Sequence, residues 1–374
     1  RFQYDLDRAG GVDMESTTTD YQFTVVAATE DLDVYGNAVL IPDADTTPSY
    51  ADHTDYGDVL VAGGTLTRTF TITNSGANVL GIGNVTTNAG GNPTNFVVTV
   101  QPAATLAIGA TTTFQVLFNP STSGVAYADI QFTSTLASAK NPYTFRVQGT
   151  GTYVEVAVSG LGNNIADGDA SPTTSDGTDF GSIALTGGTQ LRTFVITNSG
   201  NRTLSISGGI TTSGTHAADF QITTAPSATI APSGSTSFVV TFNPSAVGTR
   251  SATINFSNND DSYSDGLTES SFDFAVQGLG VAPAITNYPS TLNFSSVLGS
   301  TPAVQTFGIT NSGLGSMTYT ATSNTSWLSV LPNSATLAAG AGQIHTVAVV
   351  NVAGLQVGTS NGTITITSAD ATNS

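Results

Sequence analysis

The chain has 374 residues, of which only 9% are charged, and 26 Asp and Glu against eight Lys and Arg give a formal net charge of −18. So few cations leave no basic surface to neutralise phosphates, which argues against nucleic-acid binding and against attraction to anionic lipid. The absence of cysteine excludes disulfides, Cys-ligated metal centres and thiol catalysis. No apolar run is long enough to span a bilayer, so membrane insertion is not expected.

The first 30 residues are expected to be the C-terminal hairpin of a preceding, incomplete β-sandwich. Residues 2–4 are similar to residues 130–132, and residues 21–25 are similar to residues 143–147. The sequence is then either a segment of a much longer array or a subunit that exchanges strands with its neighbour by β-augmentation. The hairpin offers two strands where the far end of the chain needs one, which counts against strand exchange.

Residues 31–151 and 152–280 are predicted to be two copies of one domain. Segments of the first return 124 positions later, such as Asn74-Ser75-Gly76 as Asn198-Ser199-Gly200 and Phe118-Asn119-Pro120 as Phe242-Asn243-Pro244. A period of this length is a whole repeated domain rather than a solenoid unit. The second copy has an insertion of about five residues near residues 258–262, which is expected to lengthen a hairpin.

Strands are predicted almost everywhere. Residues 67–73, 113–118, 144–148 and 363–367 alternate Thr or another polar residue with an apolar one. This period of two is typical of a strand with one face in a core and one in water. Clusters of Gly, Asn, Pro and Ser separate the strands at the spacing of an antiparallel sandwich. The sequence therefore predicts an all-β fold of tandem sandwiches in an elongated array, joined by linkers of a few residues.

The acidic stretch near the start of each copy is a candidate calcium site. It places several carboxylates in a loop that contains Gly and Pro, and carboxylate oxygens are the ligands that Ca²⁺ prefers. Asp is also a common turn former, so solvated turn carboxylates are the alternative. The candidate ligands are Asp43, Asp45, Asp52 and Asp55 in the first copy and Asp167, Asp169, Asp176 and Asp179 in the second.

Residues 281–374 form a third unit with a different sequence. It is expected to lack its last strand, because residues 362–367 match a penultimate strand. Trp327 is a candidate for stacking on a sugar ring, although packing in a core is the simpler interpretation. His53, His216 and His345 fall in unrelated contexts, so no zinc site is predicted, and His345 is expected on a strand with its side chain half exposed.

Asn-Ser-Gly follows a strand in all three units, at residues 74–76, 198–200 and 311–313. The motif predicts a tight turn with the glycine at positive φ. Neither a nucleophile elbow nor a phosphate-binding loop is present, and the paired carboxylates Asp260 and Asp261 fall in a hairpin rather than a cleft. The sequence therefore predicts that the protein is not an enzyme.

The motifs of the first two units resemble the bacterial choice-of-anchor D repeats, which are immunoglobulin-like modules related to ASH and hydin-type domains. The motifs that support this are 167–181, 192–200 and 242–244, each with its counterpart in the first copy. The third unit is similar to a BACON domain through 326–330, 336–340 and 362–366. The resemblance implies immunoglobulin-like domains in a large secreted or surface protein of bacteria, and the BACON name reflects a suspected carbohydrate-binding role.

The expected function is that of a structural or adhesive segment of an extracellular surface filament, stalk or adhesin. The expected partners are neighbouring domains or subunits of the same array, or surface glycans. The alternative is an array of carbohydrate-binding modules attached to an adhesin or an enzyme. No cofactor is expected apart from Ca²⁺ at the aspartates named above.

Overall fold

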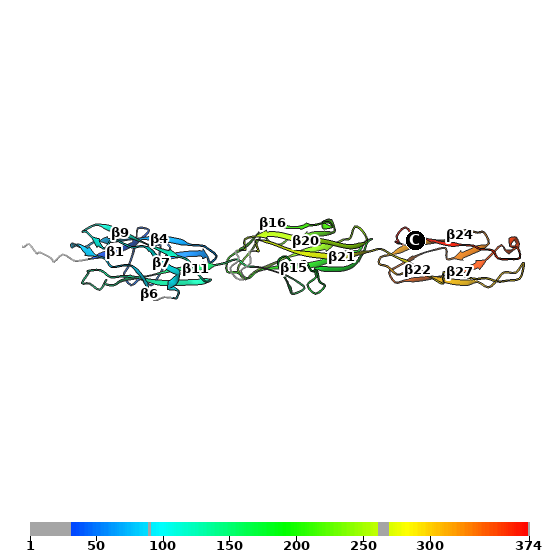
Figure 1. The fold of residues 1–374 in the computed structure, drawn as a ribbon, viewed down its shortest axis with the longest axis horizontal. Coiled ribbons are helices and arrows are strands. Elements are labelled where there is room, and N and C mark those ends of the chain that lie inside the picture. Colours follow the sequence, from blue (N-terminus) through cyan, green and yellow to red (C-terminus); the bar gives the residue numbers. More distant parts are fainter. Residues whose placement is uncertain (1–30, 89–90, 261–268, 373–374) are drawn as a thin grey trace, which may run out of the picture. The chain divides into compact units, whose positions relative to one another are not determined.

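The computed structural model describes residues 31–88, 91–260 and 269–372. Regular structure in this part of the chain is almost entirely strand, arranged in pairs of layered sheets (Figure 1). The exceptions are three single-turn 3₁₀ helices, Pro93–Asn95 (η1), Ala217–Asp219 (η2) and Val352–Gly354 (η3). The all-β prediction is confirmed. The hairpin predicted for residues 1–30 lies outside the described residues.

The chain divides into two compact units after Gly151. The first unit contains one hydrophobic core, and the second contains two separate cores, one built from residues 154–276 and one from residues 285–347. Each core lies between two sheets of its own segment. The strands alternate buried and solvent-facing residues, as in β9 (Thr111–Phe118), where Phe114, Val116 and Phe118 are buried.

In the first unit, one sheet has the order β2-β1-β4-β9-β7 and the other the order β3-β11-β10-β6, with a separate ribbon of β5 and β8. The bounds are Leu32–Gly36 (β1), Val39–Ile41 (β2), Asp55–Leu60 (β3), Leu66–Asn74 (β4), Leu80–Gly81 (β5), Thr86–Asn88 (β6), Phe96–Val100 (β7), Thr105–Leu106 (β8), Gly124–Phe132 (β10) and Tyr143–Thr152 (β11).

The second repeat has the same arrangement, with sheets β13-β12-β15-β19-β17 and β14-β21-β20-β16-β18. The bounds are Val156–Gly160 (β12), Asn163–Ile165 (β13), Asp179–Ala184 (β14), Gln190–Asn198 (β15), Leu204–Ser213 (β16), Phe220–Thr224 (β17), Thr229–Ile230 (β18), Ser235–Phe242 (β19), Gly248–Asn258 (β20) and Ser271–Val281 (β21). β20 and β21 pair antiparallel as the predicted hairpin. Residues 261 and 262 of the predicted insertion lie outside the described residues.

The third domain has smaller sheets, β22-β23-β27-β25 and β26-β24-β28. The bounds are Ile285–Tyr288 (β22), Gln305–Asn311 (β23), Met317–Ser323 (β24), Leu328–Leu331 (β25), Ser334–Leu337 (β26), Gly342–Val349 (β27) and Ile364–Thr367 (β28). The strand predicted at residues 362–367 is therefore present as β28, which pairs antiparallel with β24.

Aromatic side chains form the centre of the two repeat cores in matching positions. Phe96 stacks on Phe118 with ring centroids 4.7 Å apart, and the counterparts Phe220 and Phe242 stack at the same 4.7 Å. Burial of such large rings is the main favourable term for sandwiches of this size. The correspondence of these pairs shows that the sequence repeat is also a repeat of packing.

The Asn-Ser-Gly motif has a different role from the predicted turn. The amide nitrogen of Asn198 donates to the carbonyl oxygens of Arg202 (2.8 Å) and Ile230 (3.0 Å), and its Oδ1 accepts from the N–H of Gly200 at 3.0 Å. Gly200 does not have a positive φ. A Cβ there would lie 2.6 Å from the carbonyl oxygen of Tyr153, so close backbone approach is what requires glycine.

The same asparagine network occurs in all three domains. Asn74 and Asn311 are as buried as Asn198, and each donates to the carbonyl four residues later. The amide of Asn74 reaches the Leu106 carbonyl, and that of Asn311 reaches the Leu337 carbonyl. The prediction of a glycine at positive φ was wrong because the buried asparagine, not the glycine, organises this chain reversal.

Candidate functional site

The aspartates of the predicted calcium site organise local turns. The Asp52 carboxylate accepts from the N–H of Thr54 at 3.0 Å and from its hydroxyl at 2.5 Å. Asp176 makes the same two bonds to Thr178, at 2.9 and 2.6 Å. Burial favours the neutral acid at Asp176, but hydrogen bonds from Thr178 and Thr173 outweigh it and hold the pKa below its usual value.

The remaining aspartates of this set have matching partners in the two repeats. Asp43 and Asp167 accept main-chain N–H bonds across the domain, and Asp45 and Asp169 accept the N–H two residues later. Asp55 and Asp179 accept the N–H of a glycine and the side-chain amide of Gln148 or Gln277, at 2.9 Å in both repeats. These contacts give six of the aspartates turn-forming roles, whereas Asp43 and Asp167 bond to a distant strand; calcium binding by all eight stays a prediction.

A different set of carboxylates comes together in the second repeat. Oxygens of Glu155, Asp260 and Glu269 all lie within 4.8 Å of one another, the only group in the described part of the chain with the geometry of a metal site. Asp260 is 6% exposed and Glu269 is 8% exposed. Asp260 also accepts the N–H of Val156 at 2.8 Å. Sequence reasoning assigned Asp260 to a hairpin and did not connect it with Glu155 or Glu269.

The histidines lie in different domains, and the expectation for His345 was wrong. His345 is fully buried, with one ring nitrogen 2.6 Å from the Tyr319 hydroxyl and the other 2.6 Å from the Pro332 carbonyl oxygen. Its ring also stacks on Phe307. His345 occupies an inward-facing position of β27, so its role is in the core. Burial raises the pKa of the Tyr319 hydroxyl, which keeps it neutral.

The other two histidines contact unrelated groups. His216 accepts the N–H of Ser251 at 3.0 Å. His53 lies beside Arg68, and burial together with that guanidinium lowers the pKa of the imidazole. Trp327 is half-buried, and a Cβ on Gly362 would lie 3.1 Å from its ring. The tryptophan therefore packs against the backbone next to β28; stacking on a sugar stays a prediction.

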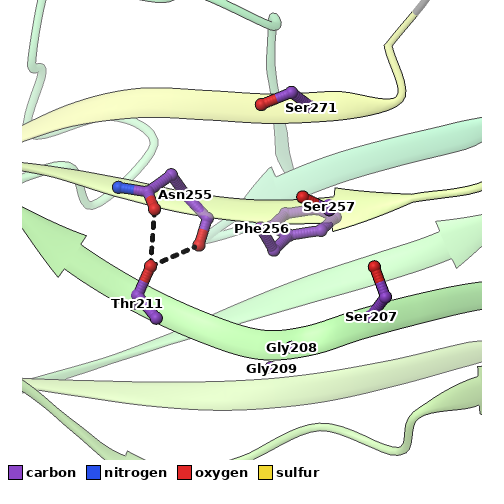
Figure 2. A pocket seen from close by; sticks show the side chains of 8 residues that line it. All are labelled: Ser207, Gly208, Gly209, Thr211, Asn255, Phe256, Ser257 and Ser271. Atoms are coloured by element: carbon purple, nitrogen blue, oxygen red, sulfur yellow. Dashed lines mark hydrogen bonds between the residues drawn. The ribbon is translucent and has the colours of Figure 1, made fainter.

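A shallow polar hollow lies beside a bulge of the second repeat. β16 bends away from β20 at Gly208 and Gly209, because its register with β20 shifts between Ser207 and Thr211. Figure 2 shows Thr211 bonded to Asn255 across the gap, with hydroxyl groups along the rim. The hollow has a volume of about 220 Å³ and no ionisable side chain among the eight lining residues, so it offers no acid, base or nucleophile pair.

No helix in the described part of the chain has the length and hydropathy of a membrane span. No curated protein sequence matches the chain significantly.

The solved structures that match the chain are distant from it in sequence. A protein of unknown function from Porphyromonas gingivalis W83 is 14% identical over 58% of this chain and 92% of its own, with a TM-score of 0.23. The VesB protease of Vibrio cholerae is 17% identical over 33% of this chain and 32% of its own, with a TM-score of 0.20. The human CEP192 ASH/PapD-like domain is 11% identical over 37% and 96%, with a TM-score of 0.22. With TM-scores below 0.5, these structures say nothing about the function of this chain.

Family models match all three domains. The HYDIN/CFA65/VesB-like Ig-like domain model matches residues 49–150 and again residues 173–268, and the viral BACON domain model matches residues 284–374. The resemblances of the two repeats and of the third domain are therefore confirmed. The chain belongs to the HYDIN/CFA65/VesB-like Ig-like domain family, with two such domains followed by a BACON domain.

Proposed function

We propose that the chain is a structural and adhesive segment of a large extracellular bacterial protein, in which the sandwiches act as a semi-rigid spacer and as interaction surfaces. The observation that carries this proposal is the combination of separate cores with short connections. Each of the three sandwiches buries its own apolar residues. Only residues 153–155 separate β11 from β12, and only residues 282–284 separate β21 from β22. Linkers this short restrict interdomain motion.

The charge distribution supports the same proposal. The surface carries a large negative charge and few lysines or arginines, which favours solubility and suppresses non-specific binding. Almost all of this charge lies before the third domain, because Asp370 is the one charged residue in residues 284–374. The neighbouring domains or subunits of an array are the partners that this proposal implies, and the bacterial cell surface is the location.

Small-angle X-ray scattering of the full chain tests the spacer role. A single compact body of 374 residues would have a radius of gyration of about 21 Å, and the proposal predicts a value well above this. A variant with a flexible Gly-Ser hexapeptide inserted after Thr152 serves as the control, because a semi-rigid connection becomes flexible in it. A radius near that of a compact body, or scattering curves that the insertion leaves unchanged, would contradict the proposal.

A carbohydrate-binding array is the second candidate, and an exposed row on the third domain favours it. Tyr288 is 84% exposed and Ile344 is 67% exposed. Both pair in register with Gly308, which has no side chain to fill the space between them. An exposed aromatic ring beside an open strand suits stacking on a neutral sugar. Glycan-array binding that Tyr288→Ala abolishes and Tyr50→Ala retains would support this candidate; no binding to any neutral glycan would reject it.

A further inference from the structure

In the first repeat, the side chain of Tyr50 covers a glycine near the start of β3. A Cβ placed on Gly57 would lie 2.9 Å from both Cε1 and Oη of Tyr50, so the ring lies directly against this stretch of backbone. Gly57 has a φ of +69°, which side chains rarely adopt, and its lack of a side chain leaves room for the ring. The first repeat therefore fills this place with a phenol ring of its own.

The second repeat has the same backbone here but lacks the ring. The residue that aligns with Tyr50, 124 positions further along the chain, is Thr174. The preceding residues, Ser49 and Thr173, each donate their N–H to a threonine hydroxyl at 2.7 Å. Their carbonyl oxygens accept aligned N–H groups at 2.9 and 2.8 Å. The two loops are therefore built alike, and what differs is the side chain that projects from them.

A hollow lies beside Gly181, which aligns with Gly57 and also has a positive φ, of +74°. No described atom beyond the two adjacent residues lies within 4 Å of a Cβ placed on Gly181. β14 bulges here, because its register with β21 shifts between Asp179 and Ser182. We call this space the Gly181 hollow; it has a volume of about 220 Å³. Its lining includes Asp179, Gly181, Ser182, Thr249, Gln277 and Leu279.

The lining of the Gly181 hollow suits a neutral ring that carries a hydroxyl group. Asp179 is the one ionisable residue of the lining, and its carboxylate already accepts a main-chain N–H at 2.8 Å and the side-chain amide of Gln277 at 2.9 Å. A carboxylate at this place disfavours an anionic ligand. The exposed side chain of Leu279 offers an apolar contact to a ring, and the hydroxyls of Ser182 and Thr249 offer hydrogen bonds.

We propose that the Gly181 hollow binds the phenol ring of a tyrosine side chain from a partner chain, in the place that Tyr50 has in the first repeat. A cavity of about 150 Å³ holds one benzene ring, so the hollow has room for a single ring. Tyrosine suits this role because it provides a large, rigid contact area at a low cost in conformational entropy. The first repeat does not bind such a ring there, because Tyr50 occupies the place.

Saturation-transfer difference NMR of the full chain with N-acetyl-L-tyrosinamide tests this site. We expect saturation transfer from the wild-type chain to the ring protons of the probe. Thr174→Tyr should weaken this transfer at least fivefold, because it fills the hollow as Tyr50 fills the first repeat. Leu279→Thr is a second variant that removes the apolar contact and should also weaken the transfer. The matched control, Thr174→Ala, leaves the hollow open and should leave the transfer unchanged.

Two further probes test whether the ring is what the hollow recognises. N-acetyl-L-alaninamide has no ring and should receive no saturation, and methyl β-D-glucopyranoside offers a sugar ring instead of a phenol. Absence of transfer from the wild-type chain to the tyrosine probe would overturn the proposal, as would equal transfer from the wild-type chain and from both hollow variants. Transfer to the glucoside that Thr174→Tyr removes, with none to the tyrosine probe, would also overturn it and would assign the hollow to a sugar.

Discussion

At one buried position the two repeats use different chemistry within the same packing. In the first repeat the residue before Phe96 is Asn95, whose Oδ1 accepts from the Ser121 hydroxyl at 2.8 Å. In the second repeat the corresponding residue is Asp219, which lies 2.5 Å from Arg250 with only 3% of its side chain exposed. A neutral pair and an ion pair thus occupy one site. The apolar neighbours are the same in both repeats, so the charged groups differ between the repeats while the core does not.

On the outer face of the sandwich the distribution is reversed: the first repeat has an ion pair and the second has neutral residues. Asp129 and Arg146 form an ion pair at 2.8 Å between β10 and β11 of the first repeat, and the Arg146 guanidinium lies over the Tyr127 ring. The aligned positions in the second repeat are Thr253 and Ala275, which also pair in register. The partners change together in each case. Each ion pair is therefore specific to one repeat, and the other repeat has the same fold without it.

The largest effect is expected from Arg250→Ala. The substitution leaves the buried Asp219 carboxylate without its ion-pair partner, and loss of one partner from a buried pair costs about 3 kcal/mol or more. Calorimetry should show a lower unfolding temperature for the second repeat. The matched control, Ala126→Gly in the first repeat, removes no ion-pair partner. An unfolding temperature for Arg250→Ala equal to that of the wild-type chain would contradict the comparison.

At this buried position, acid should lower the stability of the second repeat but not that of the first. Burial favours the neutral acid at Asp219, but the Arg250 and Ser245 hydrogen bonds outweigh it and hold its pKa below the usual value. A depressed folded-state pKa stabilises the fold above the unfolded-state pKa, and this contribution disappears as the pH falls below about 4. Asn95 does not titrate. Unfolding curves of the wild-type chain and Asp219→Asn between pH 7 and pH 3 should therefore converge on acidification; a constant difference would contradict the assignment.

The buried asparagine network is expected to matter to a similar degree in each repeat. Asn198→Ala leaves the carbonyl oxygens of Arg202 and Ile230 and the N–H of Gly200 without this partner, at a cost of about 2–3 kcal/mol. Asn74→Ala should cost the same amount in the first repeat. Denaturant unfolding of both variants measures the two values. A large loss in one repeat and none in the other would show that the network is not equivalent.

A smaller effect is expected where the repeats differ by one hydroxyl. The Tyr56 hydroxyl donates to the Val116 carbonyl oxygen at 2.9 Å inside the first core, whereas the second repeat has Phe180 in its place. Tyr56→Phe should cost about 1 kcal/mol, because one buried hydrogen bond is lost while the ring packing is kept. Chemical denaturation gives the value. Phe180→Tyr is the reciprocal variant, and equal stabilities for Tyr56→Phe and wild type would show that the hydroxyl contributes nothing.

The sequence predicted the strands, the repeat and the fold class, because alternation of polar and apolar residues reports directly on the two faces of a strand. It did not predict the contacts that depend on register. Glu155 and Glu269 are more than a hundred positions apart in the sequence, and only the pairing of β20 with β21 brings Asp260 and Glu269 beside the start of β12.

The expectation for His345 failed for a related reason. Its neighbours Ile344 and Thr346 predicted a strand, which is correct, but the alternation placed the polar ring outward. The hydroxyl of Tyr319 and the carbonyl of Pro332 provide partners inside the core, so the imidazole is buried and the larger apolar Ile344 is exposed. A buried polar group needs partners that only the folded chain reveals.

Calorimetry of the intact chain, wild type against Arg250→Ala, tests most directly the claim that each sandwich is held by its own core. The claim predicts that one transition moves to lower temperature by several degrees while the transitions of the first repeat and of the third domain stay in place. A single transition that moves as a whole would contradict it, because the sandwiches would then unfold as one cooperative body.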